Sequence, residues 1–319
     1  MTLDYLKETL LQYGMQDASA ELIRHNENMT FKVDGRYLLR IHKHVEGFHT
    51  ASIYNGINRI EIYQEELNFL KFLRTHGINV QIPCPNKNDE LVTILSDGTA
   101  ATMLTWLPGR ILEKNEVEPA LCVQIGKMVG KLHKQACLCP KLPALQYNDA
   151  LCDRLKQTIY IKKEEGAWNE LHTQSMANAL DFIAGKLHDF RNDAILTHAD
   201  LSLSNIILTD TGLVPIDFSL FGYCHPMMDL ASLFCNINGL ENRRAMAAGY
   251  RSADGNIVIT MLDCCFALNI LLSIVLHCNW WPKNDWFLSR LERWCREVFT
   301  PLAHGEALFS EDFYLLHAT

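Results

Sequence analysis

The sequence predicts an α+β protein of two lobes, a small β-rich lobe at residues 1–105 and a larger, mainly helical lobe at 106–319. Two observations predict this division. The first hundred residues contain short β-prone runs between turn signals, whereas most of the later chain has helical periodicity. Pro108-Gly109 breaks the pattern between them. A connector near 103–109 would leave a cleft between the lobes, where small ligands commonly bind.

Strands and one helix are predicted for the first lobe. Asp34-Gly35 stands between two β-prone runs, which is a strong hairpin signal. Leucines at helical spacing predict a helix that ends at Gly77. The amphipathic start of the chain predicts a helix rather than a signal peptide. The expected elements are that N-terminal helix, strands at 29–33 and 37–41, a helix at 64–77, and strands at 91–95 and 100–106.

Helices dominate the predicted second lobe. The longest apolar segment, 259–278, is interrupted by Asp263, Asn269 and His277, so we expect a buried core helix and no membrane span. The only clear β signal after residue 110 is the stretch THADLSLSNIILTDTGLVPIDFS, 197–219. The expected helices lie at 121–136, near 170–190, at 259–278 and at 285–299.

Composition and charge limit the class of protein. The 319 residues are 48% hydrophobic and 21% charged, which is ordinary for a globular protein. The net charge of −8 argues against a nucleic-acid partner. An acidic surface is compatible with a cationic small molecule, but it more often serves solubility alone. Eleven cysteines without a Cys-x-x-Cys pair indicate buried thiols in a reducing compartment, for which we expect the cytoplasm.

The stretch 197–219 predicts a β-hairpin with oxygen ligands at its open end. The residues from Thr209 to Gly212 form a turn by composition, and pairing these two sets residue 205 opposite 216. Asn205 and Asp217 then lie side by side, because cross-strand neighbours are roughly 4.5–5.5 Å apart. Their oxygens can share one divalent cation, and few oxygen ligands suit Mg²⁺.

Other polar residues of this stretch have different expected roles. Asp200 lies upstream of the same strand and could accept a proton from a hydroxyl nucleophile. We expect His198 to pack and hold the loop rather than to take part in chemistry. Asp210 belongs at a solvated turn tip. Asp217 ends an apolar strand, so partial burial would require a counter-ion.

These motifs resemble the aminoglycoside phosphotransferase and choline kinase family. The resemblance implies a bilobal protein-kinase-like fold and the activity of a small-molecule kinase. It implies that Asp200 is the catalytic base, that Asn205 and Asp217 hold Mg²⁺, and that Asp229 braces the catalytic loop. The features that carry it are His198-x-Asp200-x-x-x-x-Asn205, a short hairpin, Ile216-Asp217-Phe218 and Asp229-Leu230-Ala231.

The resemblance also implies where ATP binds. The stretch 26–31 (NENMTF) resembles the turn that covers the nucleotide phosphates, so Asn28, Met29 and Thr30 are candidate contacts. A polar strand entry is the alternative interpretation of this turn. MLTWLPG at 103–109 resembles the inter-lobe connector, whose backbone at Thr105 and Leu107 would hydrogen-bond the adenine edge.

A cation and an acid complete the implied nucleotide site. Arg40 occupies the position where the family has a Lys or Arg that touches the α- and β-phosphates. The alternative is an edge-strand arginine whose stem packs while its head reaches water. Glu66 shares a helical face with two leucines and is the implied partner of Arg40, with Glu65 as the alternative.

The implied reaction is transfer of the ATP γ-phosphoryl group to a hydroxyl of a small molecule. An aminoglycoside, a choline-like alcohol, an amino alcohol or a sugar could be the acceptor. Tryptophans and acids near the C-terminus suit a cationic acceptor, but tryptophans at helical spacing also suit a core. The alternatives are a Ser/Thr protein kinase of the same fold and a nucleotide-binding module without catalysis.

Overall fold

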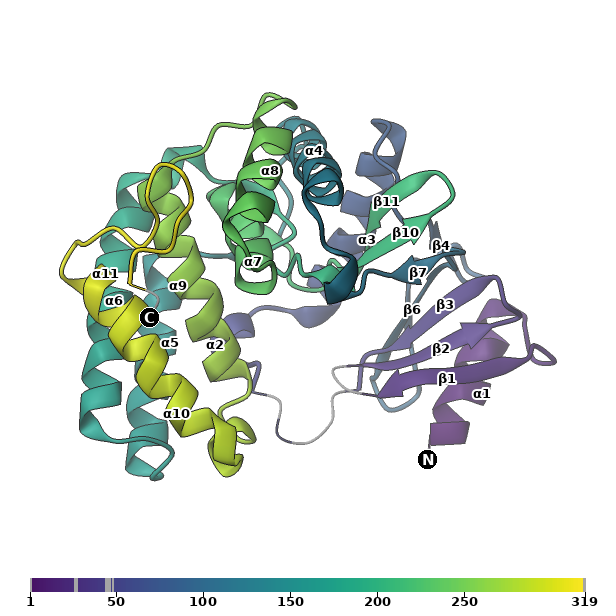
Figure 1. Cartoon of the computed structure of the whole chain (residues 1–319). Coiled ribbons are helices and arrows are strands. Elements are labelled where there is room, and N and C mark those ends of the chain that lie inside the picture. The colour runs from purple at the N-terminus through teal and green to yellow at the C-terminus, as the bar shows by residue number, and fades with distance from the viewer. Residues whose placement is uncertain (1, 26–27, 44–46, 48, 318–319) are drawn as a thin grey trace.

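The structure is a computed structural model that describes residues 2–25, 28–43, 47 and 49–317. A β-rich N-terminal lobe and a larger helical lobe lie side by side (Figure 1). The predicted α+β class is therefore confirmed.

The small lobe is built on an antiparallel sheet in the order β1-β2-β3-β6-β4, with β5 also paired to β6. The predicted hairpin of β2 and β3 is confirmed, and its turn places Asp34 and Gly35 at positive φ, as a tight hairpin turn requires. The strands are β1 (Ala20–His25), β2 (Met29–Val33), β3 (Tyr37–Ile41), β4 (Pro83–Cys84), β5 (Val92–Ile94) and β6 (Ala100–Thr105).

Two helices cover opposite faces of this sheet. Helix α1 (Thr2–Tyr13) packs Leu10 against Phe31 and Leu39 in a core of its own. Helix α3 (Arg59–Thr75) lies on the other side and brings Glu66 to the second face of β3. The helix begins five residues before the predicted start, because the side chain of Asn58 caps the amide of Ile60.

A short segment ties the small lobe to the large one. Helix α2 (Ala51–Tyr54) packs on α5 (Asp149–Glu164), where the Oγ of Ser52 and the Oγ1 of Thr158 are 2.6 Å apart. Arg154 donates from Nε to the carbonyl of Ser52 at 2.8 Å. These contacts tie the segment between β3 and α3 to the large lobe.

The large lobe holds the predicted helices and the predicted hairpin. The hairpin strands β10 and β11 pair antiparallel, and β7 after the connector adds to β10. The helices and hairpin strands are β7 (Arg110–Ile111), α4 (Pro119–Ala136), α5, α6 (Glu170–Asp189), β10 (Ile206–Thr209), β11 (Gly212–Pro215), α7 (Met227–Asn236), α8 (Leu240–Arg251), α9 (Ile259–Leu276), α10 (Asp285–Trp294) and α11 (Thr300–Ala303).

One expectation for this lobe is wrong, because 197–219 is not its only β structure. A second sheet pairs β12 (Gly222–Cys224) with β8 (Leu145–Gln146) and β9 (Ile195–Thr197). Strands of two or three residues are too short to produce the alternation that marks a strand in a sequence.

Helix α9 is the central helix of the large lobe. It is long and apolar enough to cross a membrane by length and composition, yet 78% of its most apolar window is buried inside the molecule. The helix lies against α5, α6 and α7. The predicted core helix is therefore confirmed.

A buried carboxylate on α9 holds the C-terminal segment. Asp263 accepts hydrogen bonds from the amides of Leu308 and Phe309 at 3.1 and 3.0 Å. We expect Asp263→Ala to lower the free energy of unfolding by about 2 to 4 kcal/mol, because it leaves two buried donors without an acceptor. Asp263→Asn keeps an amide oxygen there and should cost less. Chemical denaturation measures both, and an alanine variant as stable as wild type would contradict the clamp.

The same carboxyl gives a pH signature. Burial raises the pKa of Asp263 to about 6 from the ordinary 3.8, against the two amides that lower it. The folded state thus holds a proton that the unfolded state has lost between these values, so the contribution is full below 3.8 and is lost as the pH rises through 6. The stability of wild type relative to Asp263→Asn should therefore fall between about pH 4 and pH 6.

Candidate active site

The hairpin β10–β11 has the predicted register. Thr209 pairs with Gly212 and Ile206 with Pro215. Beyond the last ladder pair, the amide of Ile216 donates to the carbonyl of Asn205 at 2.9 Å. The open end of the hairpin therefore brings Asn205 and the residue after Ile216, Asp217, to one place in the cleft.

Asp217 lies at the boundary between the lobes. Its backbone has a φ of 63°, in the left-handed region that costs free energy for residues other than glycine and that, apart from turns, clusters at functional sites. The carboxylate accepts from Arg24 at 2.7 Å and from Arg40 at 3.4 Å. Burial would raise the pKa of Asp217, but these two arginines outweigh it and the pKa lies below its usual range. Asp217 is thus an anion held by cations of the small lobe.

Arg40 and Glu66 form a buried ion pair behind Asp217. The Arg40 guanidinium donates to Glu66 at 2.8 Å, whereas Glu65 accepts from Asn68 at 3.2 Å, so the structure selects Glu66 over the alternative. The edge-strand interpretation of Arg40 is wrong, because β3 lies inside the sheet. Burial would lower the pKa of Arg40, but Glu66 and Asp217 raise it. Within the described residues the buried Nε of Arg40 has no acceptor, and a phosphate oxygen would supply one.

The loop before β10 presents Asp200 next to Asn205. The Asn205 amide group donates to the carbonyl of Asp200 at 2.8 Å and to its carboxylate at 3.1 Å. Because the nitrogen of Asn205 is used on Asp200, its carbonyl oxygen is the atom that a cation could take. The two side chains are fixed relative to each other, as a proton acceptor beside a metal ligand needs to be.

Asp229, in the first turn of α7, braces this loop from below. It is fully buried and accepts from the amides of His198 and Ala199 at 3.0 and 2.7 Å, and contacts Nε2 of His133 at 2.9 Å. Ala199 has a φ of 63°, a strained conformation that these bonds hold in place. Burial would raise the pKa of Asp229, but the contact with His133 outweighs burial. The pKa of Asp229 therefore lies below its usual range, and the residue is an anion.

His198 links the loop to the hairpin. Its Nε2 lies 2.8 Å from the carbonyl of Ile216, and the amide of Asp200 donates to its Nδ1 at 3.3 Å. Accepting at Nδ1 requires a neutral ring, and burial lowers the pKa of His198 in agreement with this. The side chain therefore connects the loop of Asp200 to the strand that leads into Asp217.

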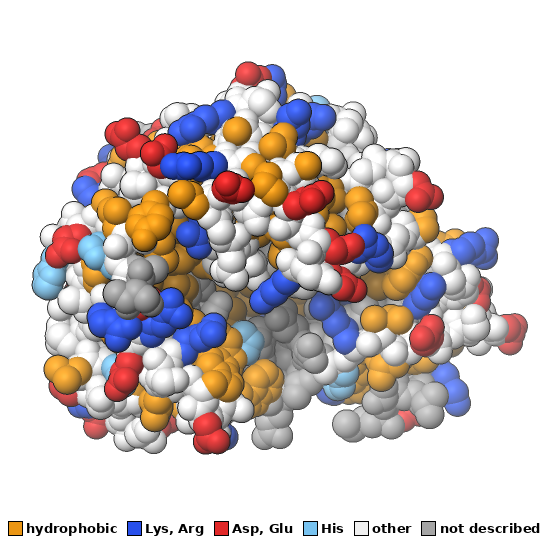
Figure 2. Space-filling view, in the orientation of Figure 1, with side chains coloured by type: hydrophobic (Ala, Val, Ile, Leu, Met, Phe, Trp, Pro, Cys, Tyr) orange, Lys and Arg blue, Asp and Glu red, His pale blue; other side chains and the backbone are white. Residues whose placement is uncertain are grey.

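A cavity of about 310 Å³ opens between the lobes at these residues. Leu38, Trp106 and Ile207 line its apolar part, and Thr30, Arg40 and Asp217 line its polar end. Figure 2 shows the hollow between the lobes, with Lys and Arg side chains near its edges. An apolar slot that ends in cations matches a nucleotide, whose base is flat and whose phosphates are anionic.

The connector lines the same cavity. The amide of Thr105 donates to the carbonyl of Ile82 at 2.9 Å, and its own carbonyl accepts from Gln81 at 2.9 Å. The backbone of Thr105 is thus already engaged, with a second lone pair left on the carbonyl. In the part of the chain that the structure describes, the Leu107 amide makes no backbone hydrogen bond, so it is the better candidate for the adenine edge.

The predicted phosphate-covering turn is only partly described. Asn26 and Glu27 lie outside the described residues. Asn28 is buried with its Oδ1 3.1 Å from Nδ1 of His42, and Thr30 faces the cavity. Met29 differs from expectation, because alternation along β2 places its side chain in the core beneath α1. Only the backbone of Met29 is left as a nucleotide contact.

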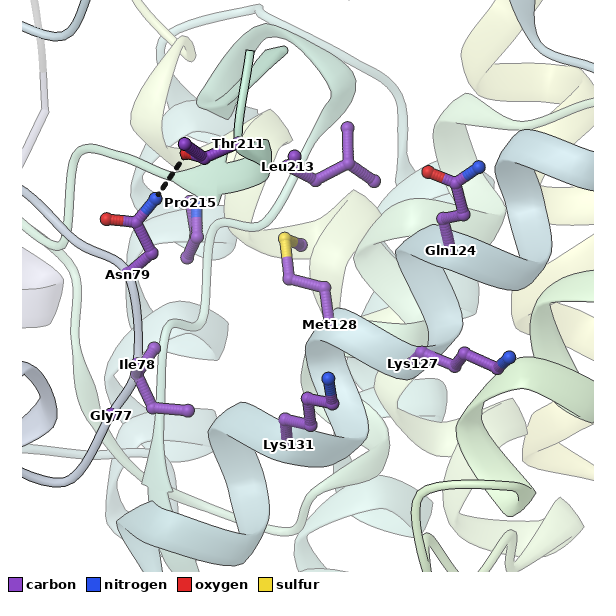
Figure 3. Close-up of a pocket in the computed structure, with 11 residues that line it drawn as sticks. Gly77, Ile78, Asn79, Gln124, Lys127, Met128, Lys131, Thr211, Leu213 and Pro215 are labelled. Atoms are coloured by element: carbon purple, nitrogen blue, oxygen red, sulfur yellow. Dashed lines mark hydrogen bonds between the residues drawn. The ribbon is translucent and has the colours of Figure 1, made fainter. Parts of the chain in front are cut away.

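A second cavity, of about 320 Å³, lies apart from these residues (Figure 3). It is bounded by α4, the loop after α3 and the hairpin tip, where Asn79 donates to Thr211 at 3.3 Å. Lys127 and Lys131 rise from α4 along its edge. None of the predicted site residues lines it.

Sequence reasoning missed several residues of the main cavity, among them Arg24 and Gln81. Arg24 lies outside the motif that begins at Asn26, and its place depends on an irregularity of β1. Gln81 lies in the loop before β4, with no neighbouring motif. The place of both residues at the cavity becomes evident only when the strands of the small lobe are paired in the structure.

Comparisons with known proteins find similar sequences. Residues 20–263 match the model of a phosphotransferase enzyme family. Amicoumacin kinase of Bacillus subtilis (strain 168) is 23% identical over 244 residues, which are 73% of this chain and 67% of that protein. Hydroxylysine kinase of Xenopus laevis is 25% identical over 229 residues, 64% of this chain and 60% of that protein.

Solved structures show the same fold. A microcompartment-associated aminopropanol kinase superposes with a TM-score of 0.70 at 20% identity, over 95% of this chain and 98% of that one. An amicoumacin kinase in complex with AMP-PNP, Ca²⁺ and Ami has a TM-score of 0.69 at 18% identity, over 93% and 92% of the two chains. The predicted bilobal, protein-kinase-like fold is confirmed.

Proposed function

The chain belongs to the phosphotransferase enzyme family, and we propose that it transfers the γ-phosphoryl group of ATP to a hydroxyl of a small molecule. One observation supports this most directly. Asp217 of the large lobe and Arg40 of the small lobe line one cavity, where Arg40 contacts Asp217. Glu66 is paired with Arg40. Asn205 is next to the lining residue Ser204 and is bonded to Asp200. A site for nucleotide binding alone would have no use for the carboxylate of Asp200.

We propose that the polar end of the cavity holds the phosphates and one Mg²⁺ ion. The carboxylate of Asp217 and the carbonyl oxygen of Asn205 are hard oxygen donors, and Mg²⁺ takes its other ligands from water and phosphates. The fit rests on Asp217, a mostly buried anion that already requires positive charge beside it. When bound, the ion neutralises charge on the phosphates during transfer. Arg40 supplies further positive charge, and its unpaired Nε gives a donor to phosphate oxygen.

In this mechanism Asp200 orients the acceptor and takes its proton. The acceptor oxygen forms a bond to the γ-phosphorus as the bond to the β-γ bridging oxygen breaks, the hydroxyl proton moves to Asp200, and ADP leaves. Asn205 keeps the Asp200 carboxylate aimed at the acceptor. Asp229 and His198 are positioning residues that hold the loop carrying Asp200.

We propose an amino alcohol as the acceptor class. Several of the proteins that the chain resembles are named for acceptors that carry both an amine and a hydroxyl, such as hydroxylysine and aminopropanol. The net charge of −8 favours a cationic acceptor over an acidic one. A cytoplasmic location is part of this proposal, because all eleven cysteines are free thiols.

An ADP-release screen tests the proposed reaction. We expect Mg²⁺-dependent ADP release with one or more amino alcohols or aminoglycosides, and loss of the signal when EDTA removes the metal. A matched screen should use the deoxy analogue of each active compound, which has no hydroxyl to phosphorylate. Phosphate found on an added protein would favour the protein-kinase alternative. ATP binding without ADP release from any acceptor would favour a module without catalysis.

A further inference from the structure

A β-bulge in the edge strand β1 turns Arg24 into the nucleotide cavity. Leu22 pairs with Phe31 on the face that packs under α1, and regular alternation would put Arg24 on that face too. The register shifts between Leu22 and Arg24, so Ile23 is an extra residue and Arg24 pairs with Thr30 on the cavity face. Bulges near active sites commonly redirect one side chain in this way.

The redirected arginine completes a row of side chains across the sheet. Thr30 pairs with Arg24 on one side and with Arg40 on the other, so the two guanidinium groups flank one threonine. Both arginines reach Asp217, Arg24 at Oδ2 and Arg40 at Oδ1. Arg40 is also bound to Glu66 and is buried, whereas the side chain of Arg24 is 49% exposed. Arg24 is therefore the cation that can move.

The contact of Arg24 with Asp217 conflicts with the proposed role of Asp217. A divalent cation on Asp217 and a guanidinium at 2.7 Å from the same carboxylate would compete for its oxygens. When the ion arrives with ATP, the guanidinium loses the carboxylate and faces the phosphates instead. An exposed arginine can make that change by side-chain rotation, and its planar fork suits phosphate oxygens as it suits a carboxylate.

We propose that Arg24 is a phosphate-binding residue that rests on Asp217 while the cavity is empty and moves to the nucleotide phosphates when a divalent cation takes Asp217. The inference rests on the proposed function, and it adds a residue outside the family motif. It implies that Arg24 has two opposite effects. It weakens binding of the bare cation, because it competes for Asp217, and it strengthens binding of the metal–nucleotide complex.

Arg24→Gln tests both effects by titration calorimetry. We expect the Kd for Mg-ATP to rise roughly tenfold or more, because one charge-assisted contact is lost. The Kd for Mn²⁺ alone should fall in the same variant, since the competing cation is gone. The Kd for adenosine should stay unchanged, because adenosine has no phosphates for Arg24 to bind. A local folding defect would instead weaken all three ligands.

Arg36→Gln is the matched control. It removes the same charge from the same lobe, at the exposed turn between β2 and β3, and should leave all three affinities at the wild-type values. Arg24→Lys should recover part of the Mg-ATP affinity. Mg-ATP binding by Arg24→Gln that equals or exceeds that of wild type would overturn the proposal. Wild type that binds no Mg-ATP would instead refute the proposed function itself, so the two failures are distinguishable.

Discussion

Replacing Asp217 with asparagine is expected to lower kcat/KM for phosphoryl transfer on the order of a thousandfold or more. The carboxylate is the only anionic side chain among the proposed metal ligands, and an amide oxygen is a much weaker ligand for a hard cation. Binding of metal-free ATP should persist or improve, because Arg40 and Arg24 lose their shared anion and keep their charge. Steady-state kinetics and calorimetry with and without Mg²⁺ measure the two effects.

Asp210→Asn is the control for this prediction. Asp210 lies at the tip of the same hairpin and is exposed, so the same chemical change should leave the kinetics at the wild-type level. Turnover by Asp217→Asn within about tenfold of wild type would rule out Asp217 as the metal ligand.

Asp200→Asn is expected to reduce kcat by about 10² to 10⁴-fold, the usual contribution of a general base. The KM for Mg-ATP should change little, because Asp200 contacts Asn205 and the loop rather than the lining of the nucleotide cavity. Single-turnover measurements separate the chemical step from product release. A variant that loses nucleotide affinity but keeps kcat would place Asp200 in binding instead of proton transfer.

The change preserves the shape of the side chain, so the loop should survive. The backbone carbonyl of Asp200 still accepts from Asn205, and its amide still donates to His198. A melting temperature close to that of wild type would show that lost turnover reflects chemistry rather than unfolding.

The sequence was informative where local rules decide the geometry. A four-residue turn fixed the register of the hairpin, and that register brought Asn205 and Asp217 together. Helical spacing put Glu66 on the inner face of α3, although only the structure distinguished it from Glu65. These relations depend on residues close together in the chain, which a pattern can reveal.

The rest depends on pairing between distant segments. The direction of Arg24 follows from a bulge, and a bulge is visible only when β1 is aligned with β2. The sheet of β8, β9 and β12 joins segments that are up to about eighty residues apart. The sequence did not reveal that the side chain of Met29 points into the core, because the resemblance names a position and not a face of the sheet.

The place of helix α9 bears on how the polypeptide is made. The small lobe has a separate core under α1 that is complete once residue 103 has been synthesised. The core of the large lobe needs α9, which begins at Ile259 and lies against three earlier helices. During synthesis, the nascent chain therefore leaves the surfaces of α5, α6 and α7 that contact α9 uncovered until most of the message has been translated. Nascent chains that stall before this helix should be targets for chaperones and proteases.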